Sequence, residues 1–182
     1  MSENSNSKYS CSRKTVSVKT GHLIFWPIML VGLAADLWTK KAVFDWLLER
    51  PEPFVSIIDG FLQLVLAVNE GAAFGIAAGQ RVLLIAVSVI ALVAVFSILF
   101  FSGNVQKIFY VALGLFAGGI CGNLYDRIFN DGKVRDFIDV YYRSYHWPAF
   151  NIADSMLCIA VGLIVIHTII GKPGRKHVRQ QK

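Results

Sequence analysis

The sequence has 182 residues, of which 55% are hydrophobic and only 16% are charged. A soluble domain carries about 25% charged residues, and the mean hydropathy here is +0.54. Long uncharged runs account for the excess. The composition therefore excludes an ordinary soluble domain and predicts one compact membrane domain. The net charge of +6 gathers at the termini without any recognition motif, which argues against nucleic-acid binding.

Four segments are apolar and long enough to span a bilayer, which takes roughly 20 residues. They cover residues 21–40, 82–101, 108–126 and 151–170. The first uncharged run ends at Ala35, so its helix must continue through Asp36 to reach the far interface. Residues 21–170 are thus predicted to form a four-helix transmembrane domain.

Charge predicts how this domain lies in the membrane. Residues 1–20 are polar and Ser-rich and are predicted to be a disordered cytoplasmic tail, and residues 171–182 form a basic one. With Lys107, which lies in the turn between the second and third spans, these segments hold ten basic residues and one acidic residue. The positive-inside rule then predicts that both termini are cytoplasmic. The polar ends of the four helices lie together on the outer side.

The connections on the outer side are of mixed polarity. Residues 54–58 and 61–66 flank Asp59-Gly60, a strong hairpin signal, and are predicted to form a small β element outside the membrane. Residues 128–148 are rich in Tyr and Trp and are predicted to be a short amphipathic segment at the interface. The fold class is therefore a mainly α-helical membrane protein with two small extracytoplasmic elements.

Ionisable residues at the ends of membrane spans are a functional-site hypothesis. Two carboxylates held close cannot both ionise cheaply, so such a pair holds one proton near neutral pH. The ionised member can then take a proton from water while the other polarises a carbonyl, which is the logic of aspartic peptide hydrolysis. Spacing alone does not choose the pair among the outer aspartates.

A purely structural alternative stays open from the residues. Asp126 would pair with Arg127, Asp136 with Arg135 or Lys133, and Asp154 would only cap a helix. In the same way, Asp36 and Lys40 stand four apart and would form a local ion pair worth a few tenths of a kcal/mol.

Five sequence blocks, in order, resemble the bacterial lipoprotein signal peptidases, also called signal peptidase II. The blocks are Asp36 with Lys40, NEGAAFG at 69–75, GGICGNLYDR at 118–127, VRDFID at 134–139 and FNIAD at 150–154. Each block is weak alone, but all five in order are highly specific, and none departs from the family's pattern.

The resemblance implies an aspartic endopeptidase of the bacterial cytoplasmic (inner) membrane, with its active site at the outer face. The family removes signal peptides from diacylglyceryl-modified prolipoproteins, cutting just before the lipidated cysteine. Globomycin and myxovirescin inhibit it from this site. No metal or cofactor is implied, and nothing demands more than a monomer.

The resemblance also assigns residues. Asp136 and Asp154 match the catalytic dyad. The supporting or substrate-binding positions are Asp36, Lys40, Asn69, Gly119, Asn123, Asp126, Arg127 and Asn151.

Two other classes compete, a small transporter and a membrane scaffold. A transporter would place polar groups near the middle of the bilayer, whereas here they gather at one face. A scaffold would not need five separated motif blocks, and single carboxamide substitutions would leave its role intact.

Overall fold

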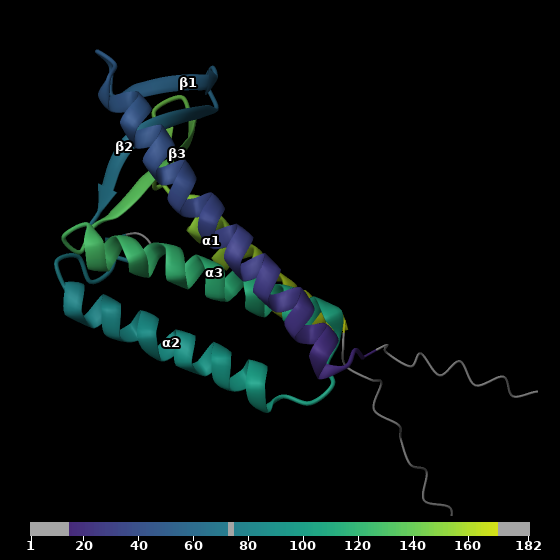
Figure 1. The fold of residues 1–182 in the computed structure, drawn as a ribbon. Coiled ribbons are helices and arrows are strands. Elements are labelled where there is room, and N and C mark those ends of the chain that lie inside the picture. Colours follow the sequence, from purple (N-terminus) through teal and green to yellow (C-terminus); the bar gives the residue numbers. More distant parts are fainter. Residues whose placement is uncertain (1–14, 73–74, 171–182) are drawn as a thin grey trace, which may run out of the picture.

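The computed structural model describes residues 15–72 and 75–170 (Figure 1). Four of its helices are long and apolar enough to cross a membrane. They are α1 (Val18–Leu48), α2 (Arg81–Phe101), α3 (Lys107–Phe129) and α4 (Ile152–Ile170). The prediction of four membrane-length helices in a mainly helical chain is confirmed.

The first helix differs most from its predicted bounds. Ser17 is its N-cap, and the hydroxyl of Ser17 accepts a hydrogen bond from the Thr20 N–H at 3.3 Å. Residues 18–20 are therefore helical, although the composition predicts disorder up to residue 20. Residues 1–14 and the basic tail 171–182 lie outside the described residues. At its other end α1 runs on to Leu48, and the charged side chains of this extension are exposed, as in the Lys41–Asp45 pair.

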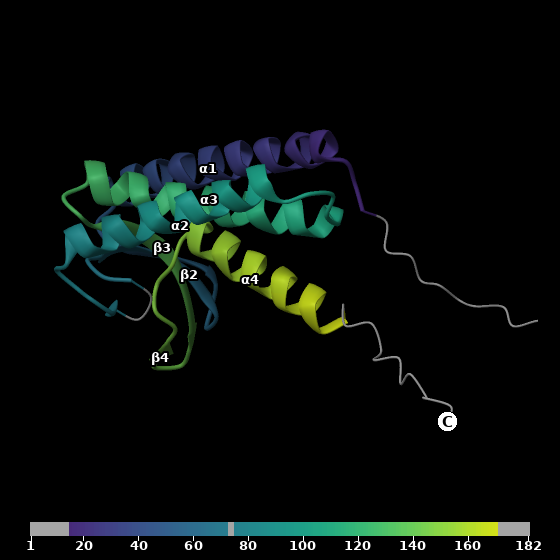
Figure 2. The same cartoon turned by 90° about the horizontal axis from the view of Figure 1, so that it is seen from below.

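Helix α3 is the centre of the bundle. In its most apolar stretch 61% of the residues are buried, against 17% in each of the other three helices. The reason is that α3 packs against α1, α2 and α4, as Figures 1 and 2 show. The core is built around Phe25 and Met29 of α1, Leu99 of α2, and Tyr110 and Ala117 of α3.

Glycines on α3 permit a close crossing with α1. A Cβ atom at Gly114 would lie 2.9 Å from the Phe25 carbonyl oxygen, and one at Gly118 would lie 3.1 Å from the Met29 carbonyl oxygen. Glycines four residues apart lie on one helix face, where they let a second backbone approach. The sequence pattern and the packing agree here.

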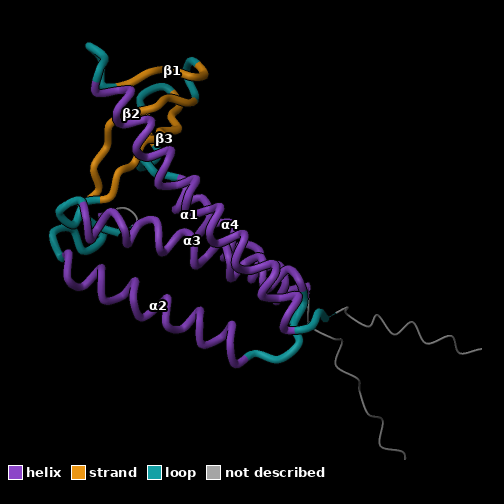
Figure 3. Tube along the Cα trace, in the orientation of Figure 1, coloured by secondary structure: helices purple, strands orange, loops and turns teal. Residues whose placement is uncertain are grey.

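A four-stranded antiparallel sheet lies at one end of the helices (Figure 3). Its order is β1-β2-β3-β4, with β1 at Phe54–Ile58, β2 at Leu62–Asn69, β3 at Val134–Tyr142 and β4 at Tyr145–His146. The predicted hairpin is confirmed, since β1 and β2 pair around Asp59-Gly60 and Gly60 has a φ of 76°.

Strand β3 lies where the sequence predicts only an amphipathic interfacial segment. It pairs with β2, and Ala67 stands opposite Asp136 in the register. Asp136 and Asp139 are both buried although they are three residues apart. Two polar residues at that spacing hide the period-2 pattern by which a strand is read from a sequence.

The opposite end of the bundle holds the start of α1, the α2–α3 connection and the end of α4 (Figures 1 and 2). There the Val16 N–H donates to the Val105 carbonyl oxygen at 2.9 Å. The start of α1 and the end of α4 thus lie on the same side, as an even number of spans requires.

Replacing Gly114 with Ala tests the close crossing of α1 and α3. The new Cβ would meet backbone at 2.9 Å, so the helices must separate. Overpacking of this kind costs about 1–3 kcal/mol, and we expect a clearly lower Tm in detergent. Gly162→Ala in α4 is the matched control, because no atom lies within 4 Å of its Cβ position. Equal Tm values for the two variants would contradict the packing argument.

Candidate active site

Polar side chains from four elements converge where the helices meet the sheet. Helix α1 brings two of them four residues apart, α3 brings three from its last turns, and β3 and the start of α4 supply the rest. They are Asp36 and Lys40; Asn123, Asp126 and Arg127; Arg135 and Asp136; and Asn151 and Asp154. Of the nine, seven are less than 9% exposed, and the exceptions are Arg135 and Asp154.

Asn151 joins the two candidate aspartates. Its side-chain N–H donates to Asp136 Oδ1 at 2.6 Å. Its Oδ1 accepts from the Asp154 backbone N–H at 3.0 Å, and its own backbone N–H donates to Asp154 Oδ2 at 3.2 Å. The exchange with Asp154 is a reciprocal capping arrangement at the start of α4. One asparagine therefore fixes a carboxylate from β3 and a carboxylate from α4 beside each other.

Asn123 orients the second carboxylate from the side of α3. The ammonium of Lys40 can only donate hydrogen bonds, so the Asn123 side-chain oxygen faces Lys40, at 3.0 Å from Nζ. The amide nitrogen of Asn123 must then face Asp154, and it donates to Asp154 Oδ1 at 2.8 Å. Both carboxylate oxygens of Asp154 thus accept a hydrogen bond.

Asp136 is 2% exposed. Burial, and then the charge of Asp154, raise the pKa of this carboxyl to about 7, although hydrogen bonds from the side chains of Asn69 and Asn151 oppose the shift. The carboxyl of Asp136 therefore keeps its proton to near neutral pH. A protonated carboxyl beside a second carboxylate is the arrangement that aspartic peptide hydrolysis requires.

Lys40 anchors a buried ionic cluster next to this pair. Its Nζ lies 2.7 Å from Asp36 Oδ2 and 3.6 Å from Asp126 Oδ2, and all three side chains are fully buried. Asp36 Oδ1 also accepts from the Ala153 N–H at 2.8 Å. The cluster thus ties α1 to α3 and to the first turn of α4, which is far more than the local pair that i,i+4 spacing suggests.

Asp126 is held by a second cation. The Arg135 guanidinium donates to Asp126 Oδ1 at 2.6 Å and to Oδ2 at 3.3 Å, and the Arg135 backbone N–H adds a bond at 3.0 Å. Arg127 points elsewhere, to the Gly71 carbonyl oxygen at 2.9 Å. The purely structural pairing of the aspartates with their sequence neighbours is therefore wrong at Asp126, and Asp136 has amides rather than a cation as hydrogen-bond partners.

The remaining predicted positions lie around the site in different roles. Asn69 ends β2, and its Oδ1 accepts from the Gly71 N–H at 2.9 Å. Gly119 is a packing position, since a Cβ there would lie 2.6 Å from the Ala153 carbonyl oxygen. It supports the pair by letting α3 contact the start of α4.

A further polar cluster was not predicted from the sequence. Asp139 Oδ2 accepts from Gln63 Nε2 at 2.6 Å and lies 2.8 Å from His146 Nδ1. The His146 ring stacks on Tyr141. His146 is thus tied to the sheet, and the cluster joins β2, β3 and β4. Only its place in the VRDFID block distinguished Asp139 in the sequence.

The fold and the site define a multi-pass membrane protein with two neighbouring aspartates, of which Asp136 is buried, at one end of its helices. Residues 28–170 match the family model described as signal peptidase (SPase) II. A lipoprotein signal peptidase from Sulfurihydrogenibium sp. is 37% identical over 84% of this chain and 95% of its own length. One from Halalkalibacterium halodurans is 35% identical over 81% and 92%.

The fold is also similar to that of a solved structure. A bacterial membrane enzyme determined by the in meso method at 2.3 Å is 29% identical, with a TM-score of 0.75 over 93% of this chain and 99% of its own. The chain belongs to the signal peptidase II family. It is a membrane peptidase, and the family removes signal peptides from lipoproteins.

Lys40→Met tests the ionic cluster. The change leaves the fully buried Asp36 carboxylate without its cation, whereas Asp126 keeps Arg135; breaking a buried pair in this way costs about 3–5 kcal/mol. We expect a large fall in Tm in detergent. Lys41→Met is the neighbouring control, because its pair with Asp45 is exposed and such pairs contribute at most about 1 kcal/mol. A Lys40→Met variant as stable as Lys41→Met would refute the role of the cluster.

Asp136→Asn tests the raised pKa. The ordinary pKa of this carboxyl is 3.8, and in the folded protein it is about 7. The folded state thus holds a proton that the unfolded state releases, so stability declines as pH rises from 4 to 7. The decline is at most about 1.4 kcal/mol per pH unit. Asparagine does not titrate, so the Tm of the variant relative to the parent should increase between pH 5 and pH 8. A constant difference would show that the pKa is not raised.

Proposed function

We propose that the chain is an aspartic endopeptidase that cleaves diacylglyceryl-modified prolipoproteins just before the lipidated cysteine, with Asp136 and Asp154 as the catalytic pair. The observation that carries this proposal is the shared asparagine. Asn151 bonds to both carboxylates, at 2.6 Å to Asp136 and 3.2 Å to Asp154. The other two acids of the site, Asp36 and Asp126, form ion pairs with Lys40 and Arg135.

The chemistry follows from the different surroundings of the two carboxyls. Asp154 takes a proton from a water molecule as that water attacks the scissile carbonyl carbon. Asp136, whose pKa is raised to about 7, gives its proton to the carbonyl oxygen. When the tetrahedral intermediate collapses, Asp154 returns its proton to the leaving amine and Asp136 regains its own. No proton is gained or lost over the cycle.

The location suits a substrate that stays in the bilayer. The pair lies at the end of the helices, beside the sheet. A lipid-bearing peptide would bring its scissile bond to that level. Strand β1, at the edge of the sheet, exposes Phe54 and Ile57, and β4 exposes Tyr145. These side chains offer an apolar surface that could hold the peptide against the membrane.

The orientation belongs to the same proposal. Lys19 and Lys107 lie at the end of the bundle opposite to the aspartates, and both tails are basic. The positive-inside rule assigns that end to the cytoplasm. The active site then faces outward from the cytoplasmic (inner) membrane, in a monomer, and globomycin-type peptides would bind it. Asn69, Asn123 and Arg127 are the positions from which substrate or inhibitor would be held.

Cleavage of a diacylglyceryl-modified prolipoprotein tests the function. We expect the purified chain to cleave it, and Asp136→Asn and Asp154→Asn each to lose activity by about 10²–10⁴-fold or more. Both variants should still bind globomycin, because a carboxamide keeps the shape. Asp45→Asn, an exposed change on α1, is the control and should retain full activity.

Two outcomes would overturn the proposal. Normal cleavage by either variant would mean that the catalytic pair lies elsewhere. A folded parent chain that does not cleave the lipidated precursor would refute the substrate assignment.

A further inference from the structure

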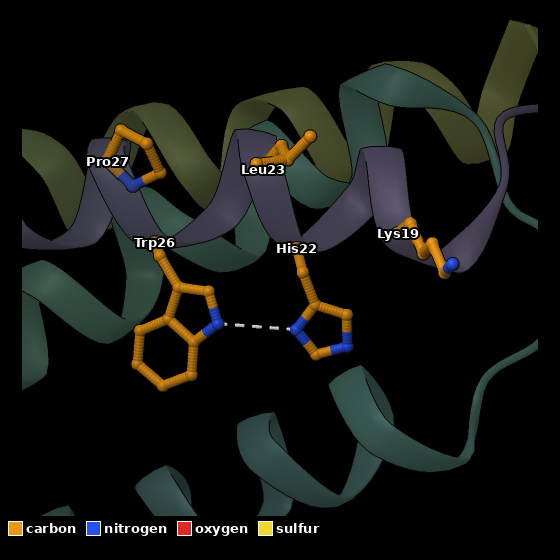
Figure 4. A pocket seen from close by; sticks show the side chains of 5 residues that line it. All are labelled: Lys19, His22, Leu23, Trp26 and Pro27. Atoms are coloured by element: carbon orange, nitrogen blue, oxygen red, sulfur yellow. Dashed lines mark hydrogen bonds between the residues drawn. The ribbon is translucent and has the colours of Figure 1, made fainter.

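A second site lies far from the aspartates, on a face of α1 of which only His22 and Trp26 contact α2. A groove of about 570 Å³ is lined by Lys19, His22, Leu23, Trp26 and Pro27 (Figure 4). These positions follow the i, i+3, i+4, i+7 spacing of one helix face. Trp26 stacks on Phe96 of α2, and His22 lies beside Phe100. We call this feature the α1 groove.

The groove runs from the membrane surface into the hydrocarbon. Lys19 is the second residue of α1 and lies close to the end of the bundle, where Val16 bonds to Val105. From Lys19 to Pro27 the helix rises about 12 Å. The charged end therefore lies at headgroup level, and Leu23, Trp26 and Pro27 lie deeper. An apolar groove open to the bilayer is filled by lipid.

His22 has a hydrogen-bond donor at the end of the groove near Lys19. The Trp26 indole N–H donates to His22 Nδ1 at 3.2 Å. Because an indole nitrogen can only donate, Nδ1 must accept, and the ring proton is on Nε2. Figure 4 shows Nε2 on the part of the ring that is turned away from Trp26. The Trp26 bond thus fixes the tautomer, and the Nε2 N–H has no hydrogen-bond partner within residues 15–72 and 75–170.

The charged residues of the described chain near this end of the bundle, Lys19 and Lys107, are both basic. Within residues 15–72 and 75–170, Lys19 has no ion-pair partner. Residues 15–22 and 100–110 contain no Asp or Glu, and Lys107 lies at the same end. An unpaired ammonium and a free N–H above an apolar groove are complementary to a phosphate that carries an acyl chain.

We propose that the α1 groove binds one anionic phospholipid of the surrounding leaflet. Its phosphate contacts Lys19 and His22 Nε2, and one acyl chain lies over Leu23, Trp26 and Pro27. The bound lipid braces α1 against α2 at the end of the bundle where Trp26 stacks on Phe96 and His22 lies beside Phe100. This site is independent of the peptidase chemistry and does not rest on it.

Thermal unfolding of the full chain in detergent, with added phospholipid, tests the proposal. A ligand that binds only the folded state raises Tm. We expect dioleoyl phosphatidylglycerol to raise Tm by several degrees more than dioleoyl phosphatidylcholine does. Native mass spectrometry should show one phosphatidylglycerol retained by the parent chain.

Variants of the groove residues distinguish specific binding at the α1 groove from general contact with lipid. Lys19→Gln and His22→Phe should each lose most of the phosphatidylglycerol preference and weaken its binding about tenfold, while Lys19→Arg keeps it. Lys41→Gln is the control, because it removes an exposed lysine of α1 at the other end of the helix. Lys19 is exposed, so its variants test the proposal even where His22→Phe does not fold.

Several results would overturn the inference. Equal effects of the two lipids, or an unchanged preference in Lys19→Gln, would mean that only unspecific boundary lipid is present. A Tm shift reproduced by inorganic phosphate at the same concentration would mean a free anion site instead of a lipid site.

Discussion

The rest of the site depends on the contacts of the buried Lys40 ammonium. A charge inside a membrane helix needs close acceptors, since isolated burial of an ammonium ion is very costly. Lys40 finds them in Asp36, Asp126 and the Asn123 side-chain oxygen. These contacts come from two helices, and Asp36 reaches on to the backbone of α4. One cation thus sets how α1, α3 and α4 meet, and it turns the Asn123 amide toward Asp154.

The same constraint divides the carboxylates into two kinds. Asp36 has Lys40 in contact and Asp126 has Arg135 in contact, so each of these two acids has a cation as its partner. Asp136 and Asp154 are bonded mainly by neutral amides, from Asn151 and Asn123. An amide carries no charge, so it favours the ionised form far less than a cation does. The pair that we propose as catalytic is therefore the pair that has no cation in direct contact among the described residues.

Much of the fold could be predicted from the sequence, because span length, the Asp59-Gly60 turn and the glycine spacing are local signals. Strand β3 could not, since its partner β2 lies about 70 residues away in the chain and its two buried aspartates interrupt the alternation. The choice of Asp136 and Asp154 came from the resemblance and stays a prediction. What no spacing rule contains is the orientation of Asn123 and Asn151, which depends on which donors the folded chain brings to each oxygen.

The glycine face of α3 connects this site to the packing of the bundle. Helices in lipid gain little from burying apolar surface, so close backbone contact must hold them together. The face that admits Phe25 and Met29 continues to Gly122, where an added Cβ would collide with the Asp36 carboxylate. A side chain at Gly122 would therefore push away the acid that pairs with Lys40 and caps α4. The small residues that let α1 approach α3 also leave the space in which the ionic cluster forms, so the packing and the chemistry of this end cannot be changed separately.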